Sequence, residues 1–568
     1  MSRNRLATIL PVLLLLAALV WALRTHLRGA GPRVADSMPG RASALEPDPD
    51  DPPEVAIGER LFRETRFAQF FFANGGGNVN AALTRGDPVL DRTQTADGTL
   101  PGPFSGSAMS CRACHMVGEH SSPDRGGSRS YADFARRSPV PFRGDGQTLT
   151  ARNSPAMVGA ASPGRGALLH FDGEFESAAA LARETLLGRN LGWLPGERAE
   201  AVRQVARVIR EDDGSAPLGR AFGGAYRDVF AAAASVPPGL RLPPRFRLEV
   251  GAASDEAIVE AVAGLIGAYV ESLDFHRDAG NRFDGSPYDI FLRKNDLPRQ
   301  PEPGESDSTY SRRLSERLER LDAPRFVGPG DGSFRLHAQA FEFGPRELRG
   351  LQVFLREAAR PQGAGPGGGA GNCMSCHPAP RFTDFGFHNT GAAESEYEAV
   401  HGSGAFARLA IPNLEARNAG FDDCLPASHA HAQARGPFRS VPSKSRPGDA
   451  DLGVWNVFGN PDLPKPQAAL REMLGRDRPD GAAAALLERA IARFKTPGLR
   501  DLGHSAPYLH TGRAGTLEDV LAHYVEFSAR ARAGTMRNPD PRISGIVLTA
   551  GDLPDLAAFL RSLNEDYE

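Results

Sequence analysis

The chain has 568 residues, of which 41% are hydrophobic, and its formal net charge at pH 7 is only −3. This length exceeds what one hydrophobic core usually supports, so two or three domains are expected. The near-neutral charge and the lack of any nucleic-acid-binding motif argue against DNA or RNA as a partner.

The N-terminus has the pattern of a targeting segment. Two arginines precede an apolar run at residues 7–23, which is at the lower edge of the length of a membrane span. Cleavage after Ala22 and retention as an uncleaved anchor both fit this pattern. We therefore interpret residues 1–27 as a signal peptide or membrane anchor and residues 28–53, rich in Pro, Asp, Gly and Ser, as a linker. Both alternatives predict export.

Two copies of the pattern Cys-x-x-Cys-His carry most of the functional information. Two thiols at this spacing can bond to the two vinyl groups of one haem, and the adjacent histidine then becomes an axial ligand of the iron. A redox-active cysteine pair or half of a zinc site would not require the following histidine twice. Two covalent c-type haems are therefore predicted. The copies are Cys111-x-x-Cys114-His115 and Cys373-x-x-Cys376-His377.

Covalent haem attachment agrees with the predicted export, because bacteria attach c-type haem outside the cytoplasmic membrane. We expect the protein in the periplasm or on the outer face of that membrane, with membrane contact only through an N-terminal anchor. The fifth cysteine, Cys424, has no partner left for an internal disulfide. A buried, inert thiol is the favoured interpretation of Cys424, and a haem ligand is the alternative.

Helical patterns are clear in both halves of the chain. Residues 258–273 have helical hydrophobic periodicity after an N-cap at Ser254. A capping box from Thr516 to Asp519 precedes another helix, and residues 556–563 form an apolar helix near the C-terminus. Strand signals are sparse, and the 63 glycines and 46 prolines predict long loops. Residues 70–107, 298–345 and 392–490 show little periodicity and are expected to be loops or insertions.

The landmarks recur in the same order in the two halves. Each half has a Gly-containing apolar segment, then a Cys-x-x-Cys-His motif, then a terminal apolar helix. The sequence therefore predicts a mostly α protein with two cytochrome c-like domains in tandem and with long loops and insertions. The N-terminal domain is expected at residues 54–297, an insertion or linker at 298–345, and the C-terminal domain at 346–568.

Several segments around these landmarks resemble one family, the bacterial di-haem cytochrome c peroxidases, which include the MauG-type enzymes. The resemblance runs from about Ile57 to the C-terminus and is interrupted by the insertions. It is specific because the segments occur together and in the family's order. They are residues 152–155, 172–173, 286–289, 381–391, 494–500 and 506–512.

The resemblance implies different roles for the two haems. It makes His115 the proximal ligand of an N-terminal haem at which peroxide reacts, and His377 that of a C-terminal haem that transfers electrons. It also implies a calcium ion held by the Asn153 side chain and by the backbone carbonyls of Ser505 and Pro507, which are oxygen ligands that suit a hard cation. The alternative for Asn153 is an ordinary turn asparagine.

The resemblance also singles out the second axial ligand of the C-terminal haem. In the peroxidases a methionine occupies this position, and in MauG-type enzymes a tyrosine does. The same offset from His510 leads to Tyr524 in this chain. A phenolate ligand lowers the potential of haem iron, whereas a thioether raises it. The alternatives are that Tyr524 is a core residue, or that the adjacent His523, about 100° around the helix, is the ligand.

The chain departs from the family on the distal side of the first haem, where acid–base groups assist O–O cleavage. Counting from Asp172 places Leu181 and Leu191 at the positions of the family's Gln and Glu. Glu184 is the nearest carboxylate that could substitute as the catalytic acid–base group. His170 is a candidate on the distal face, with a structural or surface histidine as the alternative. These losses predict slow peroxide turnover.

The sequence thus predicts a di-haem c-type oxidoreductase that reduces peroxide or oxidises an unknown partner, with electrons relayed through the C-terminal haem. A small redox protein is expected as electron donor or acceptor, and hydrogen peroxide or an unknown compound as substrate. The alternative is a periplasmic di-haem electron-transfer cytochrome without catalysis of its own.

Overall fold

The computed structural model describes most of the chain after residue 45. The described residues are 46–91, 93–95, 98–100, 104–115, 137–138, 140–161, 167–335, 337–357, 369–476 and 481–566. All of them fall in the unit that spans residues 43–568. The predicted signal or anchor segment lies outside these residues. Within them, no helix combines the length and apolar character needed to cross a membrane.

Helices dominate the described residues, and the strands form only two small antiparallel ladders there. Strand β1 (Thr93–Thr95) pairs with β2 (Gly98–Leu100), and β3 (Phe387–His388) pairs with β4 (Phe494–Lys495). The β3–β4 ladder joins the segments that follow the second haem motif and precede His510. The mostly α prediction is confirmed.

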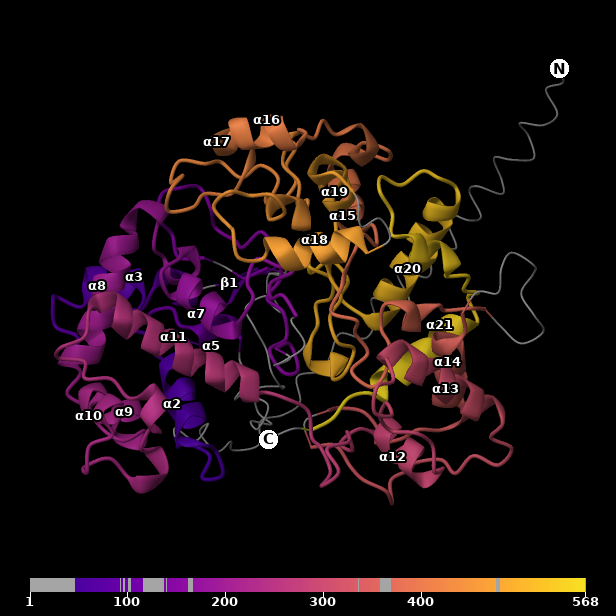
Figure 1. The fold of residues 1–568 in the computed structure, drawn as a ribbon, viewed down its shortest axis with the longest axis horizontal. Helices are drawn as coiled ribbons and strands as arrows, with labels where there is room; N and C mark the ends of the chain where they lie inside the picture. The colour runs from indigo at the N-terminus through magenta and orange to yellow at the C-terminus, as the bar shows by residue number, and fades with distance from the viewer. Residues whose placement is uncertain are drawn as a thin grey trace. The chain divides into compact units, whose positions relative to one another are not determined.

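The first group of helices surrounds α11 (Asp255–Ser272), which begins where the sequence predicted. The hydroxyl of Ser254 accepts a hydrogen bond from the Ala257 N–H at 3.2 Å, as an N-cap does. Figure 1 shows α11 beside α2, α7 and α8, and their buried apolar side chains form one cluster. The other helices of this group are α2 (Pro53–Phe62), α3 (Gln69–Asn74), α4 (Pro88–Asp91), α5 (Cys111–Cys114), α7 (Ala178–Leu186), α8 (Arg198–Glu211), α9 (Pro217–Ala221) and α10 (Tyr226–Ala231).

The second group contains the C-terminal helices. Thr516 and Asp519 form the predicted capping box at the start of α20, and the predicted apolar helix near the C-terminus is α21, which ends at Arg561. Helix α12 packs into the same hydrophobic cluster as α14 and α21. The helices are α12 (Pro287–Lys294), α13 (Asp307–Glu319), α14 (Pro345–Leu355), α20 (Leu517–Arg532) and α21 (Asp552–Arg561).

Corresponding glycines bring one helix pair together in each half. A Cβ atom at Gly58 of α2 would lie 2.2 Å from the Leu265 carbonyl oxygen of α11. A Cβ atom at Gly350 of α14 would lie 2.0 Å from the Asp555 carbonyl oxygen of α21. Only glycine permits such close crossings. Because these glycines are the corresponding landmarks of the two halves, the packing agrees with the predicted duplication.

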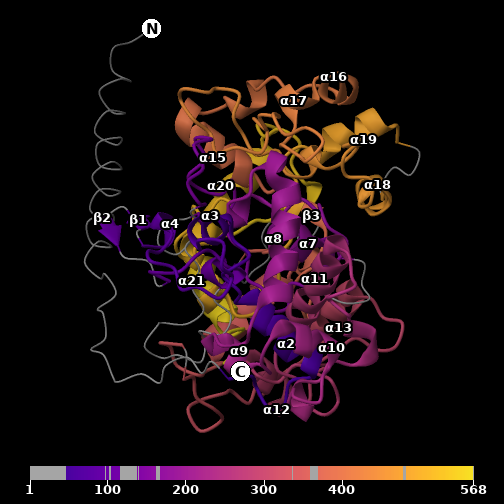
Figure 2. The same ribbon diagram turned by 90° about the vertical axis from the view of Figure 1, so that its left-hand side faces the viewer.

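Residues 392–490 were expected to be loops or insertions, and the loop interpretation is wrong. The described part of this stretch contains five α-helices with a hydrophobic cluster that includes Trp455 and Phe406. The search for helical hydrophobic periodicity missed these helices because each has ten residues or fewer. Similarly, α13 lies within 298–345, α4 lies within 70–107, and α3 overlaps the start of that stretch. Figure 2 shows α16–α19 together in a second view. The helices are α15 (Ala392–His401), α16 (Leu414–Ala419), α17 (Phe421–Cys424), α18 (Gln467–Gly475) and α19 (Ala483–Ala490).

A candidate cavity for two haems

An interior cavity of about 410 Å³ is lined by both Cys-x-x-Cys-His motifs. The remaining lining is mostly apolar and comes from all three groups of helices and the loops between them. The structure therefore brings together two motifs that are more than two hundred residues apart in the chain. The lining residues from the motifs are Cys111, Cys114, His115, Cys373, Cys376 and His377.

The first motif lies on α5, a single helical turn that presents both thiols to the cavity. Nδ1 of His115 is 3.1 Å from the Pro155 carbonyl oxygen. A histidine that donates from Nδ1 keeps Nε2 as the coordinating nitrogen, which is how proximal ligands are oriented. Burial lowers the pKa of His115 to about 4, so the imidazole is neutral and able to bind a metal.

The second motif repeats this arrangement. Its cysteines lie on and next to a 3₁₀ turn (Cys373–Ser375), and Nδ1 of His377 is 2.9 Å from the Phe382 carbonyl oxygen. Burial lowers the pKa of His377, and it raises that of Cys373 to about 12. Paired cysteines and neutral, oriented imidazoles beside an apolar cavity fit covalently attached haem at both motifs.

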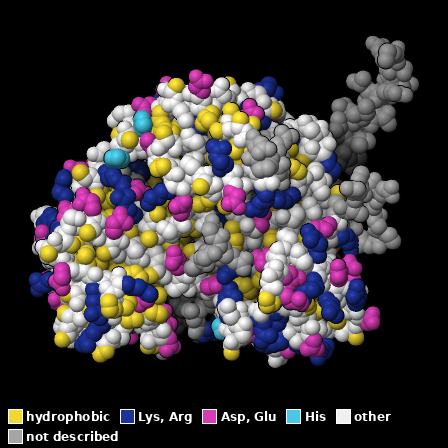
Figure 3. Space-filling model, viewed as in Figure 1, with side chains coloured by type: hydrophobic (Ala, Val, Ile, Leu, Met, Phe, Trp, Pro, Cys, Tyr) yellow, Lys and Arg dark blue, Asp and Glu magenta, His cyan; other side chains and the backbone are white. Residues whose placement is uncertain are grey.

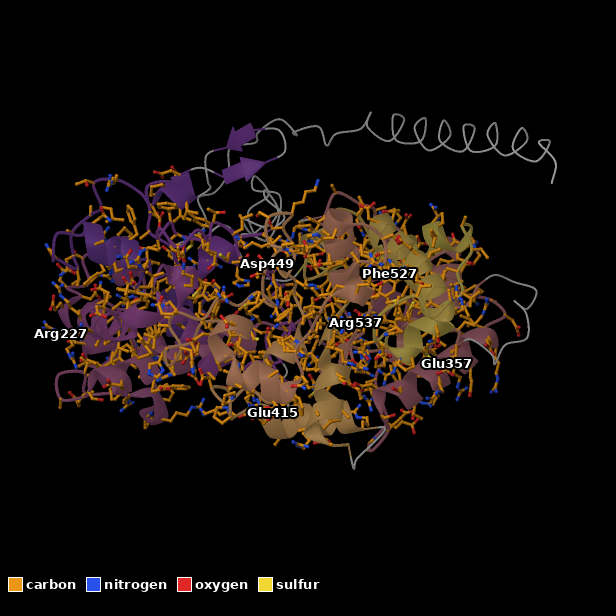
Figure 4. All side chains as sticks on the ribbon, turned by 90° about the horizontal axis from the view of Figure 1, so that it is seen from above. Arg227, Glu357, Glu415, Asp449, Phe527 and Arg537 are labelled. Carbon is orange, nitrogen blue, oxygen red and sulfur yellow. The ribbon has the colours of Figure 1, made fainter. Side chains whose placement is uncertain are left out.

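Tyr524 lines the cavity from α20, whereas His523 turns away from it. Burial raises the pKa of Tyr524, and the neighbouring Cys376 and Cys373 raise it further, which places the phenol close to the second motif. Nε2 of His523 lies 2.9 Å from the Thr390 carbonyl oxygen. The His523 ring also stacks on Phe527 of the same helix, labelled in Figure 4, at 4.5 Å.

The distal side of the first motif is apolar where the sequence comparison predicted leucines. Leu181 and Leu191 both line the cavity. Glu184 is not among the lining residues, and its carboxylate binds two nitrogens of Arg198 at 2.8 Å each and also pairs with Arg183. The catalytic role of Glu184 stays a prediction, and its surroundings do not favour it.

His170 also lines the cavity, and it lies near enough to His115 to lower the pKa of that residue further. Nδ1 of His170 is 3.2 Å from Oε2 of Glu174. Sequence reasoning missed the ionic network behind it. In this network Arg439 pairs with Asp172 and Glu174, and Arg152 pairs with Asp172 at 2.7 Å. The Arg439–Asp172 pair joins residues 267 positions apart in the chain.

Two further lining residues were part of matched segments, but the sequence assigned them no role. The His510 ring stacks on Phe494 at 3.5 Å, and its Nε2 is buried without a hydrogen-bond partner among the described residues. Burial lowers the pKa of Lys495 to about 8, and its amine faces the Phe385 ring at 5.6 Å. Lys495 thus lines the cavity, where its amine could donate to a polar group of a bound cofactor.

The three residues predicted to hold calcium lie together at the cavity wall. The Asn153 N–H donates to the His510 carbonyl at 2.7 Å, and the Asn153 side-chain amide donates to the Pro507 carbonyl. The amide oxygen of Asn153 is buried without a hydrogen-bond partner among the described residues. A buried oxygen without a donor, beside backbone carbonyls, is a donor set that suits a hard cation.

Comparison with known proteins finds similarity to cytochrome-c peroxidases and to MauG. No family model matches the chain. It is 30% identical over 180 residues to the cytochrome-c peroxidase IdrP2 of a Pseudomonas species, which covers 28% of this chain and 46% of that protein. It is 24% identical over 196 residues to the cytochrome-c peroxidase IdrP1 of Denitromonas iodatirespirans, covering 34% and 38%. Over 73 residues it is 34% identical to the methylamine utilization protein MauG of Methylorubrum extorquens, covering 13% and 19%.

The matches span less than half the length of each of these curated relatives. Among solved structures, a MauG-like protein associated with microbial copper homeostasis aligns with a TM-score of 0.40 at 17% identity, over 94% of this chain and 96% of that one. The diheme peroxidase BthA from Burkholderia thailandensis aligns with a TM-score of 0.39 at 18% identity, over 92% and 89%.

Proposed function

Because the chain belongs to the family of di-haem cytochrome c peroxidases and MauG-like proteins, we propose that it is a c-type di-haem oxidoreductase. It would react at the N-terminal haem and relay electrons through the C-terminal haem. The observation that carries this proposal is the shared cavity, which is lined by both haem attachment motifs and by Tyr524.

The haems, when bound, supply the redox-active iron, and the chain supplies their surroundings. Nδ1 of His115 and of His377 donates to a backbone carbonyl, which holds each imidazole with Nε2 toward the cavity. The Tyr524 phenol, which lines the cavity near the second motif, would help to hold the iron of the C-terminal haem. Lys495 could donate to a polar group of the cofactor, and the apolar lining limits the entry of water.

The residues on the distal side of the first haem motif bear on the choice between two reactions, peroxide reduction and oxidation of a partner. Peroxide reduction needs a group that moves a proton between the two oxygens. Leu181 and Leu191 cannot do so, and Glu184 lies outside the cavity lining, bound to arginines. We therefore propose that slow peroxide turnover accompanies oxidation of a partner. His170 is the remaining candidate for a distal proton-transfer group.

The partner and the compartment belong to the same proposal. We propose a small redox protein as electron donor or acceptor and a location in the periplasm or on the outer face of the membrane. Figure 3 shows basic and acidic side chains interspersed over the face in view, which does not favour a partner of strongly one-signed charge. We also propose one calcium ion at Asn153, Ser505 and Pro507.

Optical and EPR spectra of the ferric, fully loaded protein test this function. An oxidoreductase of the proposed kind shows one high-spin haem that binds small ligands such as cyanide or azide, and one low-spin haem. The alternative, an electron-transfer cytochrome without its own catalysis, requires two low-spin haems that resist such ligands. Two low-spin signals and no ligand-induced change would overturn the proposed function.

A further inference from the structure

Two histidines and an aspartate from separate parts of the chain meet in a buried cluster outside the haem cavity. Nε2 of His337 lies 2.9 Å from Oδ1 of Asp501, and Nδ1 of His504 lies 2.8 Å from Oδ2 of the same carboxylate. One ligand atom from each of the three side chains lies within 4.8 Å of the others. The side chains are only 5%, 4% and 6% exposed, in the order His337, Asp501, His504.

The carboxylate of Asp501 has an oxygen that the surrounding protein does not satisfy. Among the described residues, no group donates a hydrogen bond to Oδ1 of Asp501 with acceptable geometry, although Nε2 of His337 is close. Nε2 instead lies 3.2 Å from the Glu565 carbonyl oxygen. A buried carboxylate oxygen without a donor is unfavourable. Oδ2 of the same carboxylate is hydrogen bonded to Nδ1 of His504, so Oδ1 is the oxygen that remains available to a bound cation beside the two imidazoles.

The backbone holds these donors in place. A 3₁₀ turn (Leu502–His504) follows Asp501, whose φ of +55° lies in the left-handed region, so that Asp501 and His504 face the same point. A Cβ atom at Gly503 would lie 2.7 Å from Nδ1 of His337, so a glycine is needed for the His337 ring to approach. The rings of His337 and His504 are 4.0 Å apart.

We propose that His337, Asp501 and His504 bind one divalent transition-metal ion, with Zn²⁺ as the best match. Two imidazole nitrogens and one carboxylate oxygen suit zinc, whereas calcium prefers a shell of oxygens only. The Glu565 carbonyl oxygen is near enough to contribute to the same shell. The three ligands are neither the haem ligands nor the residues proposed to hold calcium, although His504 directly precedes Ser505, and the zinc proposal does not depend on the proposed function.

Bound zinc would join three distant parts of the protein. His337 comes from the stretch between the two predicted domains, Asp501 and His504 precede the segment that carries His510, and Glu565 lies near the C-terminus. With its ligands buried on all sides, the ion would stabilise this junction without taking part in redox chemistry.

The test uses the full-length protein with both haems attached. After chelator treatment and removal of the chelator, it is titrated with Zn²⁺, and bound metal is measured by mass spectrometry of the elements. We expect one zinc per chain in the wild type. His337→Gln and His504→Gln should each weaken binding by at least about tenfold. His431→Gln is the matched control, because His431 also pairs with an aspartate, Asp462, at 2.9 Å without a third ligand. It should bind zinc as the wild type does.

Haem content and circular dichroism show whether each variant is folded. If neither ligand variant folds, X-ray absorption at the zinc edge of the wild type decides, because haem iron does not contribute there. A shell with two imidazoles and oxygen supports the site. The proposal is overturned if the wild type binds no stoichiometric zinc, if folded His337→Gln and His504→Gln bind it unchanged, or if the zinc shell lacks two imidazoles. In that event the cluster is a hydrogen-bonded triad without an ion.

Discussion

His523 and Tyr524 are consecutive residues of α20, yet only Tyr524 faces the second haem motif. Nε2 of His523 is held 2.9 Å from the Thr390 carbonyl, while the Tyr524 phenol lines the cavity near Cys376. Consecutive helical side chains point about 100° apart, so both cannot face one iron. This relationship favours tyrosine as the axial ligand of the C-terminal haem.

Tyr524→Phe is therefore expected to change that haem alone. Without the phenol oxygen, its iron becomes five-coordinate or takes up water, and the EPR spectrum shows a changed spin state. His523→Gln should leave the spectrum as it is, since that side chain bonds to Thr390. An EPR spectrum of Tyr524→Phe identical to that of the wild type would return Tyr524 to the role of a core residue.

Cofactor content is the most direct test of the two motifs. The denatured wild-type protein should retain a mass increment of two haems, because thioether bonds survive denaturation. Replacing Cys373 and Cys376 with Ala should remove only the second increment, because the first motif lies on a different group of helices. Mass spectrometry of the intact protein measures both, and an increment of one haem in the wild type would contradict the prediction.

The parts of the structure that the sequence predicted are those specified by nearby residues. The haem motifs, the N-cap at Ser254 and the capping box at Thr516 are local patterns, and the structure shows the caps where they were expected. The helices within 392–490 were missed because they depend on distant contacts. Arg417, for example, is buried and donates to the carbonyls of Trp455 and Phe458, some forty residues away.

The residues of the candidate site also differ in whether the sequence could predict them. Its attachment residues follow from spacing, whereas the ion pair of Arg439 with Asp172 joins residues 267 positions apart in the chain. No local pattern marks such a pair. His337 likewise meets Asp501 only because the chain folds back over more than one hundred and fifty residues.

A buried ionic cluster in the first group of helices makes stability depend on pH. Burial raises the pKa of Glu64, but the charge and hydrogen bonds of Arg66 outweigh this and hold it below its ordinary value. The Tyr226 hydroxyl also donates to Glu64, at 3.0 Å. The stabilisation is therefore complete above the unfolded pKa of about 4.3 and is lost as the pH falls through the lower folded value.

Glu64→Gln should lower the free energy of unfolding by about 1.5–3 kcal/mol at neutral pH, the usual contribution of a hydrogen bond to a charged group. The difference from the wild type should shrink as the pH is lowered from about 5 to about 3, since the wild type loses the same charge there. Denaturant unfolding followed by circular dichroism measures both. A difference that stays constant over this range would mean that Glu64 is not ionised in the folded protein.

Calcium removal tests the group at Asn153. Chelation should alter the optical spectrum of the wild type, because Asn153 and Pro507 lie on the wall of the haem cavity. Asn153→Ala should show the altered spectrum without chelator and respond little to added Ca²⁺. Zinc must be present in excess throughout, so that a change in the optical spectrum cannot come from loss of the zinc ion. A variant that responds to calcium as the wild type does would exclude Asn153 as a ligand.

Peroxide turnover with artificial electron donors should be slow, although the first haem binds small ligands. The leucines at 181 and 191 face the cavity in place of acid–base groups, whose assistance typically increases the rate by about 10²–10⁴-fold. Glu184→Gln should leave the rate unchanged, since its carboxylate is held by Arg198 outside the cavity lining.

Leu181→Gln combined with Leu191→Glu should raise the rate at least about tenfold, as it restores part of the missing proton transfer. Leu191→Gln alone controls for the change in polarity without an acidic group. Steady-state assays with normalised haem content separate the outcomes. Fast turnover in the wild type that is lost in Glu184→Gln would assign the proton transfer to Glu184 after all. Fast turnover retained in that variant but lost in His170→Ala would assign it to His170, which already lines the cavity and lies near His115.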